Sequence, residues 1–224
     1  QKMKARRRLP LDNATEVNTS QLAYGPTEWD DYDVPPLTTG LSNEKMTMWA
    51  FLGSDCLLFA SLISTYLLLR NRVGPDTDGS TAAELFDIPF TSVSSFVLLM
   101  SSLTMVLAVT SIGRGEIERC KMWLLTTAIL GAVFIAGQVY EFTGFYREGL
   151  GFTTNISSSA FFTLTGFHGV HVSLGIIMLV TLWSLISRGN IGAERAETVE
   201  IIGLYWHFVD IVWIVIFAVV YLIP

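Results

Sequence analysis

Charged residues are scarce in this sequence, and their scarcity points to a class of protein. They make up 15% of the 224 residues, against about 25% in a typical soluble domain. Hydrophobic residues make up 51%, and the charged residues are missing from long apolar blocks. This pattern indicates an integral membrane protein of one domain.

Basic residues and cysteines are also few. The formal net charge is -6 and comes largely from loops and the N-terminal segment, which argues against a nucleic acid as partner. Cys56 and Cys120 form no CxxC motif and have no Cys/His pairing, so a disulfide, copper-thiolate or zinc site has little support. No short apolar core with a cleavage site follows the early arginines, so a cleaved signal peptide is not expected.

Five segments are long and apolar enough to cross a bilayer, which takes about 20 residues in a helix. These segments are Met46–Leu69, Thr91–Ile112, Met122–Phe145, Ile156–Ile186 and Val199–Ile223. The sequence therefore predicts an all-α fold, a polytopic membrane bundle of five transmembrane helices. We divide the chain into a cytoplasmic N-terminal tail, residues 1–45, and a five-helix transmembrane domain, residues 46–224.

Lysine and arginine are unevenly distributed between the two sides of this topology. One side holds six in the tail, three in 113–121 and two in 187–198, whereas the other side holds only Arg70, Arg72 and Arg147. Cytoplasmic loops carry the excess of basic residues. The excess of eleven basic residues on one side against three on the other predicts a cytoplasmic N-terminus and an external C-terminus.

A few ionisable side chains interrupt the spans, and such residues often mark function. They are Asp55, Glu141, His168, His171, His207 and Asp210. At about 1.5 Å per residue, Asp55 and His207 both lie roughly 12–14 Å from the cytoplasmic end of their spans. Glu141 and His168 both lie toward the outer side. We therefore expect two acid–base pairs, Asp55 with His207 and Glu141 with His168.

Three interpretations of these residues stay open. His168 and His171 are three apart and share a helix face, so both could ligate one ion. However, three histidines on two helices cannot supply a haem–copper centre. A proton path needs closely spaced titratable groups, and the clusters that these residues form leave gaps of more than a helical turn. The third interpretation is that each group bonds a neighbouring helix, which we favour for Asp210.

Small and hydroxylated residues suggest where helices approach one another. Gly53, Ser54, Ala60 and Ser61 are expected to permit close helix packing. The segment SVSSFVLLMSSLT, residues 92–104, is expected to form an interhelical seam.

Five motifs resemble subunit III of the haem–copper respiratory oxidases. They are WAFLGSDCLLFASL (49–62), LFDIPFTSVSSFVLLMSS (85–102), QVYEF (138–142), AFFTLTGFHGVHV (160–172) and YWHFVDIVWIVIFAVVYL (205–222). They occur in the family's order and cover all five spans. The number of spans resembles the shorter bacterial form of the family.

The resemblance implies a non-catalytic subunit of a proton-pumping terminal oxidase in the bacterial inner membrane. It implies a V-shaped, phospholipid-filled cleft between the first two spans and the other three. It also implies binding to the catalytic subunit I and to subunit II, whose haems and copper do the chemistry, with room for small subunits or a supercomplex. No cofactor or metal is expected on this chain itself. The candidate cleft or intramembrane polar residues are Asp55, Glu141, His168, His171, Trp206 and His207.

One departure affects the electron donor. Asp55 stands where the cytochrome c oxidase branch usually has glutamate, and Ser-Asp-Cys resembles the bo-type quinol oxidase branch. We favour cytochrome c oxidase and keep a quinol oxidase as the alternative. A small membrane transporter is the alternative from another class, although the spans show neither an internal repeat nor a broken helix.

Overall fold

The computed structural model describes residues 42–70, 72, 87–192 and 195–222, and these residues form five long helices with no strand among them. The helices are α1 (Asn43–Leu69), α2 (Ile88–Gly113), α3 (Ile117–Arg147), α4 (Ile156–Ser187) and α5 (Ala196–Phe217), with a π-helical turn η4 (Ala218–Leu222) continuing α5. All five are long and apolar enough to cross a membrane. The prediction of five spans is confirmed, and residues 1–41 of the predicted tail lie outside the described residues.

Polar residues at the helix starts explain where three of the helices begin. The side chains of Ser42 and Asp87 accept hydrogen bonds from the N–H groups of Lys45 and Phe90, each at 3.2 Å. Asn155 forms a reciprocal capping box with Ser158 at the start of α4. Such caps satisfy N–H groups that the helix leaves without partners.

Two helices end at the same side of the bundle in the same way. Arg114 and Arg188 are the C-cap residues of α2 and α4, and each is followed by a glycine with positive φ, 76° at Gly115 and 75° at Gly189. The next N–H then bonds back to a carbonyl of the last turn. Glycine suits this left-handed position because it has no Cβ.

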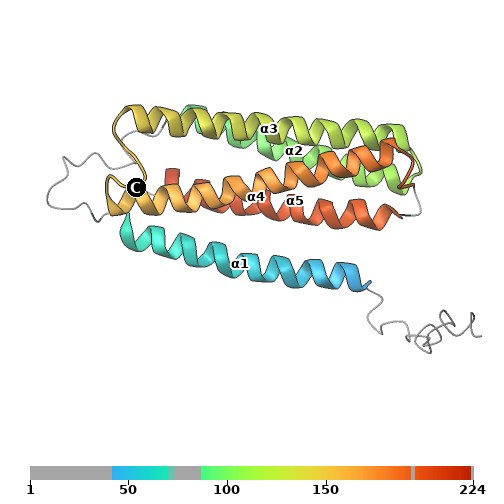
Figure 1. The fold of residues 1–224 in the computed structure, drawn as a ribbon, viewed down its shortest axis with the longest axis horizontal. Coiled ribbons are helices and arrows are strands. Elements are labelled where there is room, and N and C mark those ends of the chain that lie inside the picture. The colour runs from blue at the N-terminus through green and yellow to red at the C-terminus, as the bar shows by residue number, and fades with distance from the viewer. Residues whose placement is uncertain (1–41, 71, 73–86, 193–194, 223–224) are drawn as a thin grey trace, which may run out of the picture. The chain divides into compact units, whose positions relative to one another are not determined.

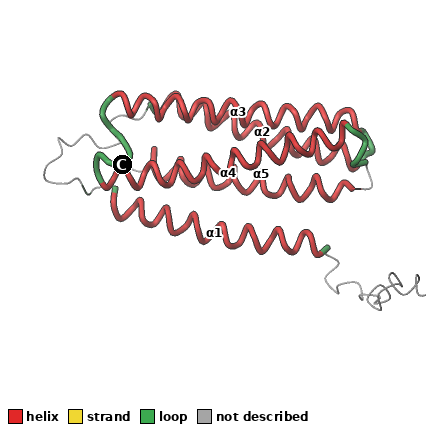
Figure 2. Tube along the Cα trace, in the orientation of Figure 1, coloured by secondary structure: helices red, strands yellow, loops and turns green. Residues whose placement is uncertain are grey.

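The helices of the unit Ser42–Pro224 run up and down and fall into three rows (Figures 1 and 2). α2 packs closely on α3, and this pair packs on α4 and α5. α1 forms an outer row against α4 and α5. The resemblance led us to expect the first two helices to stand together across a cleft from the other three. This expectation is wrong, because α2 packs within the bundle on α3 and α5 rather than beside α1.

Tryptophans of α5 and hydroxyls of α2 form the seam between these two helices. Trp206 Nε1 donates to Ser101 Oγ at 3.0 Å, and Trp213 Nε1 donates to Ser95 Oγ at 2.9 Å. Both indole rings are almost fully buried. The predicted seam at 92–104 is confirmed, since its serines satisfy indole N–H groups that would otherwise be unpaired in an apolar interior.

The small residues of α1 have a different place from the one we expected. Gly53, Ser54, Ala60 and Ser61 are all exposed, and a Cβ added at Gly53 would have no neighbour within 4 Å. These residues lie on the face of α1 that turns away from α4 and α5, so the prediction of close packing there is wrong within the described part of the chain.

Candidate functional site

Asp55 and His171 face one another between α1 and α4. Asp55 is buried, and its Oδ2 lies 3.7 Å from Nε2 of His171. His171 Nδ1 lies 2.7 Å from the carbonyl oxygen of Phe167, one turn earlier on α4. A carbonyl only accepts hydrogen bonds, so Nδ1 carries a proton and donates it there. The remaining nitrogen, Nε2, is the one turned toward the carboxyl.

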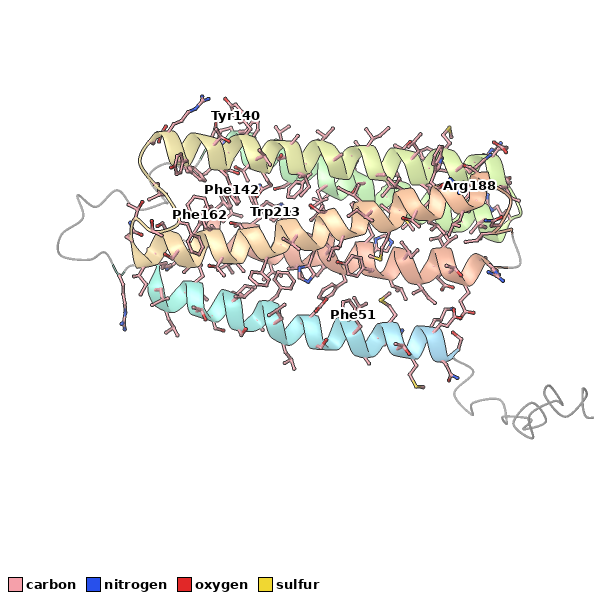
Figure 3. The ribbon with its side chains drawn as sticks, in the orientation of Figure 1. Phe51, Tyr140, Phe142, Phe162, Arg188 and Trp213 are labelled. Carbon is pink, nitrogen blue, oxygen red and sulfur yellow. The ribbon has the colours of Figure 1, made fainter. Side chains whose placement is uncertain are left out.

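Aromatic rings from α1 and α5 surround this pair. Phe59 of α1 meets the His171 ring edge-on, with ring centroids 4.9 Å apart. From α5, Tyr205 donates a hydrogen bond from its hydroxyl to the carbonyl of His171 at 3.0 Å, and its ring stacks on Phe51. Phe51 points from α1 toward the bundle in Figure 3. The site therefore joins α1, α4 and α5 about midway along α1.

The predicted pair of Asp55 with His207 is wrong. His207 lies on α5 with its Nδ1 2.6 Å from the hydroxyl oxygen of Ser102 on α2. Depth alone suggested Asp55 as its partner, but His207 of α5 faces α2, whereas Asp55 of α1 faces His171 of α4. His207 therefore helps to join α5 to α2 instead of α5 to α1.

His168 occupies a buried aromatic pocket, away from Glu141. Its ring is fully buried and stacks on Trp213, with centroids 4.9 Å apart and planes 26° apart. Phe134 contacts it edge-on at 6.0 Å between centroids. Neither ring nitrogen has a hydrogen-bond partner among the described residues. The predicted pair of Glu141 with His168 is therefore wrong.

Glu141 instead joins α2, α3 and η4. Its Oε1 accepts hydrogen bonds from Thr91 Oγ1 at 2.8 Å and from the Tyr221 hydroxyl at 3.1 Å. Its Oε2 accepts from Gln138 Nε2 at 3.4 Å. The acidic residue is thus satisfied by neutral donors of three elements, as the helix-bonding interpretation requires. Tyr221 comes from η4, where the π-helical turn changes the direction of its side chains relative to α5.

Trp206 was expected at the cleft, but it lies in the core between three helices. Its ring contacts the Cα positions of Gly131 on α3 and Gly175 on α4, where an added Cβ would lie 2.5 Å and 2.8 Å from ring atoms. Its indole N–H reaches Ser101 on α2. Asp210, on the same helix, is buried, and its Oδ1 has no hydrogen-bond partner among the described residues.

The histidines do not converge on one point. His168 stacks on Trp213, whereas His171 faces Asp55. Within the described ranges, no group of three or more His, Cys, Asp or Glu side chains is arranged to hold a metal ion. The hydrogen bonds of the Asp55–His171 site also do not connect to those of Glu141 in this part of the chain. The arrangement favours helix pairing over a shared ion or a continuous proton relay.

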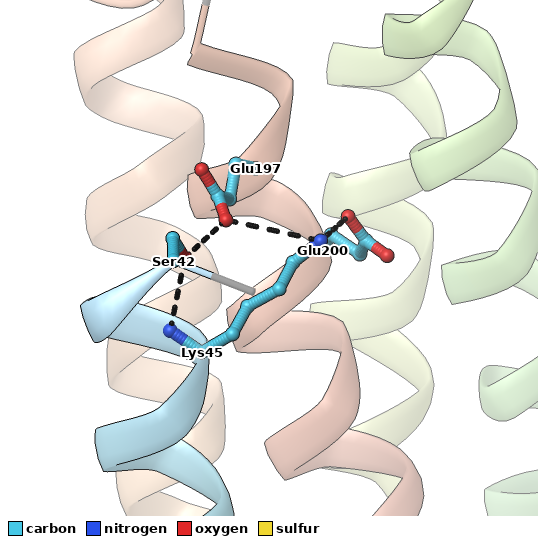
Figure 4. Close-up of polar contacts among 4 residues, drawn as sticks. All are labelled: Ser42, Lys45, Glu197 and Glu200. Carbon is cyan, nitrogen blue, oxygen red and sulfur yellow. Dashed lines mark hydrogen bonds and ion pairs between the residues drawn. The ribbon is translucent and has the colours of Figure 1, made fainter. Parts of the chain in front are cut away.

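A polar cluster that the sequence did not reveal joins the start of α1 to the start of α5 (Figure 4). Lys45 Nζ lies 2.9 Å from Glu200 Oε2 and 3.8 Å from Glu197 Oε1. The Ser42 hydroxyl donates to the same Glu197 oxygen. Exposed ion pairs contribute little to stability because water and salt screen them, so the cluster adds only modestly to the contact of α1 with the bundle. Its signal in the sequence was Lys45, the residue directly before the first predicted span.

Comparison with known proteins agrees with the motifs and the helix order. The model of the family described as cytochrome c oxidase subunit III matches residues 36–223. A cytochrome c oxidase subunit 3 of Bacillus sp. (strain PS3) is 39% identical over 180 residues, covering 80% of this chain and 86% of the relative.

Relatives that are named quinol oxidase subunits are about as similar to this chain as the cytochrome c oxidase subunit is. A cytochrome bo(3) ubiquinol oxidase subunit 3 of Pseudomonas aeruginosa is 38% identical over 80% of this chain and 85% of its own length. A probable quinol oxidase subunit 3 of Staphylococcus saprophyticus is 37% identical over 80% and 88%. The chain belongs to the cytochrome c oxidase subunit III family of haem–copper oxidase subunits.

Proposed function

We propose that the chain is subunit III of a cytochrome c oxidase. We propose also that this subunit carries no redox centre of its own. The observation that carries this proposal is the family match over all five spans, residues 36–223. The possible metal ligands support the lack of a redox centre, because the chain has three histidines and the two on α4 face different neighbours. Its role is to bind subunits I and II, whose haems and copper reduce oxygen to water.

A quinol oxidase is the second candidate. The observation that favours it is the similarity to relatives carrying that name at 37–38% identity, together with Asp55 in the first span. The electron donor is handled by other subunits, so the two candidates assign the same role to this chain.

Affinity purification tests the proposal. A tagged chain, extracted in mild detergent, is expected to co-purify with larger subunits and to show haem absorption bands. Oxygen consumption with reduced cytochrome c or with a quinol then identifies the donor. The chain separated from its partners is expected to hold no stoichiometric metal by elemental analysis. One metal ion per separated chain, or purification without any haem protein, would contradict the proposal.

We also propose that the chain spans the bacterial inner membrane with the N-terminus in the cytoplasm. The excess of lysine and arginine at the N-terminal side supports this orientation. In the fold, the start of α1, the α2–α3 turn, the end of α4 and the start of α5 lie at one end of the bundle (Figure 1). The count of basic residues on the two sides relies on this placement. A reporter enzyme fused after Pro224 should be active only outside the cytoplasm, whereas one fused within residues 113–116 should be active only inside.

Bound phospholipid and support of proton uptake belong to the same proposal. The feature that supports them is the Asp55–His171 pair, which lies where α1 leans on α4 and α5. A polar pair that deep is expensive unless it has a structural or functional role. We expect this pair to hold α1, and the lipid beside it, against the rest of the bundle.

A further inference from the structure

A cavity of about 350 Å³ lies at the turn between α2 and α3, on helices other than those of Asp55 and His171. The end residues of α2 and the first turns of α3 line it. Its cationic side chains are Arg114 and Arg119, its acidic side chain is Glu116, and its apolar walls include Leu107, Met122 and Trp123. The lining therefore combines charged and apolar side chains.

The two arginines differ in their partners. Arg119 Nη1 lies 2.8 Å from Glu116 Oε2, so these two charges compensate one another. Arg114 is exposed and has no ion-pair partner among the described residues. The cavity thus keeps one uncompensated positive charge, which lies on Arg114.

The other polar side chains of the lining already have hydrogen-bond or ion-pair partners, so Arg114 is the main hydrogen-bond donor for a ligand. The hydroxyl hydrogens of Thr110 and Ser111 are donated to carbonyls of Val106 and Leu107 at 2.8 Å and 2.7 Å. α3 begins beside them without a side-chain cap, and its first-turn N–H groups favour negative charge at the same end. An anionic group held here would bind the Arg114 guanidinium, which presents paired N–H groups to a phosphate.

The order of the lining fits a lipid better than a free anion. Leu107 lies two turns before Arg114 on α2, which places the apolar wall roughly 10 Å deeper at about 1.5 Å per residue. Met122 is 54% exposed, so this wall continues into the surface that faces the membrane. A tryptophan beside the charged rim is typical of the headgroup level.

We propose that this cavity binds the phosphodiester headgroup of an anionic phospholipid, with Arg114 on the phosphate and the acyl chain over Leu107 and Met122. The site is separate from the Asp55–His171 contact and does not depend on the chain's role in the oxidase. It would fix a lipid at the end of the α2–α3 pair.

Lipid titration of the purified complex tests this proposal. The detergent-purified oxidase, stripped of lipid, is titrated with phosphatidylglycerol or with phosphatidylcholine of the same acyl chains, and bound lipid is counted by native mass spectrometry. The same titration applies to the tagged chain alone. Since one arginine near an anionic surface contributes about 1 kcal/mol, Arg114→Gln should weaken phosphatidylglycerol binding about five-fold. Phosphatidylcholine should bind the wild type more weakly than phosphatidylglycerol.

Arg188→Gln is the matched control, because Arg188 is also an exposed C-cap residue before a positive-φ glycine but does not line the cavity. It should bind phosphatidylglycerol like the wild type. The proposal would be overturned if the two variants lost phosphatidylglycerol binding equally, or if Arg114→Gln bound it as the wild type does. Equal binding of the two lipids by the wild type would also overturn it. So would displacement of the lipid by millimolar inorganic phosphate, which indicates a free-anion site. Release of the chain from the complex by Arg114→Gln with unchanged lipid binding would indicate a protein contact instead.

Discussion

Replacing Gly175 by alanine is expected to destabilise the bundle, whereas the same replacement at Gly169, on the same helix, is not. A Cβ at position 175 would lie 2.8 Å and 2.9 Å from two ring atoms of Trp206, well inside van der Waals contact. The ring cannot move away, because Gly131 of α3 touches its other part and its indole N–H is bonded to Ser101. Four helices meet at this ring, so a displacement there separates them.

The magnitude follows from two opposing effects. Overpacking a core typically costs about 1–3 kcal/mol, and the gain in helix propensity from glycine to alanine offsets up to about 1 kcal/mol. At Gly169 only the gain remains, because an added Cβ has no neighbour within 4 Å. Trp206→Ala should be worse than either, since removing a buried tryptophan costs about 3–5 kcal/mol.

Heating the detergent-solubilised chain and measuring the fraction that stays monodisperse on gel filtration checks these expectations. Gly175→Ala should lose monodispersity at a lower temperature than wild type, and Gly169→Ala should match or exceed wild type. Trp206→Phe in the Gly175→Ala background should recover part of the loss, because phenylalanine lacks the second ring. Equal behaviour of the two glycine variants would show that Trp206 is not confined as described.

The spans were predictable because hydropathy is summed over about 20 residues and tolerates local errors. The seam of serines in α2 was predictable for a related reason, since hydroxyls in an apolar helix need partners. Both features depend on composition along one helix. They need no knowledge of how that helix is rotated.

The pairings failed because they depend on rotation. Counting residues placed Asp55 and His207 at a similar depth, but it could not show that His207 faces α2 and its Ser102. A span that is apolar on all sides gives little indication of which face turns inward. The sequence does carry a signal for the position of Trp206. This signal is the pair of mid-span glycines at 131 and 175, which leave space for a large ring.

Replacing His171 by leucine is expected to loosen α1 from the bundle, while Asp55→Asn is expected to be mild. With His171 Nδ1 bonded to the Phe167 carbonyl, Nε2 is the ring nitrogen that faces the Asp55 carboxyl, 3.7 Å away. Asparagine keeps the size and the polarity of the aspartate side chain opposite Nε2. Leucine at 171 instead puts an apolar side chain opposite the buried carboxyl, and leaving a buried polar group without a polar neighbour costs about 1–3 kcal/mol.

The double variant Asp55→Leu/His171→Leu separates this explanation from simple loss of packing. Removing both polar groups leaves neither unpaired, so the double variant should be more stable than His171→Leu alone. In the same gel-filtration assay, a double variant as unstable as the single one would show that the imidazole acts through its volume and not through Asp55.

Oxygen consumption followed over time relates the pair to the oxidase. Asp55→Asn should leave assembly and initial turnover nearly intact, because the reacting metals belong to other subunits in the proposed complex. His171→Leu and the bulkier His171→Trp should shorten the working lifetime of the enzyme and reduce its bound phospholipid, measured by mass spectrometry on the purified complex. If Asp55→Asn instead abolishes initial oxygen reduction in a fully assembled, haem-replete complex, the carboxyl takes part directly in proton delivery, and its role is not confined to holding α1 and lipid in place.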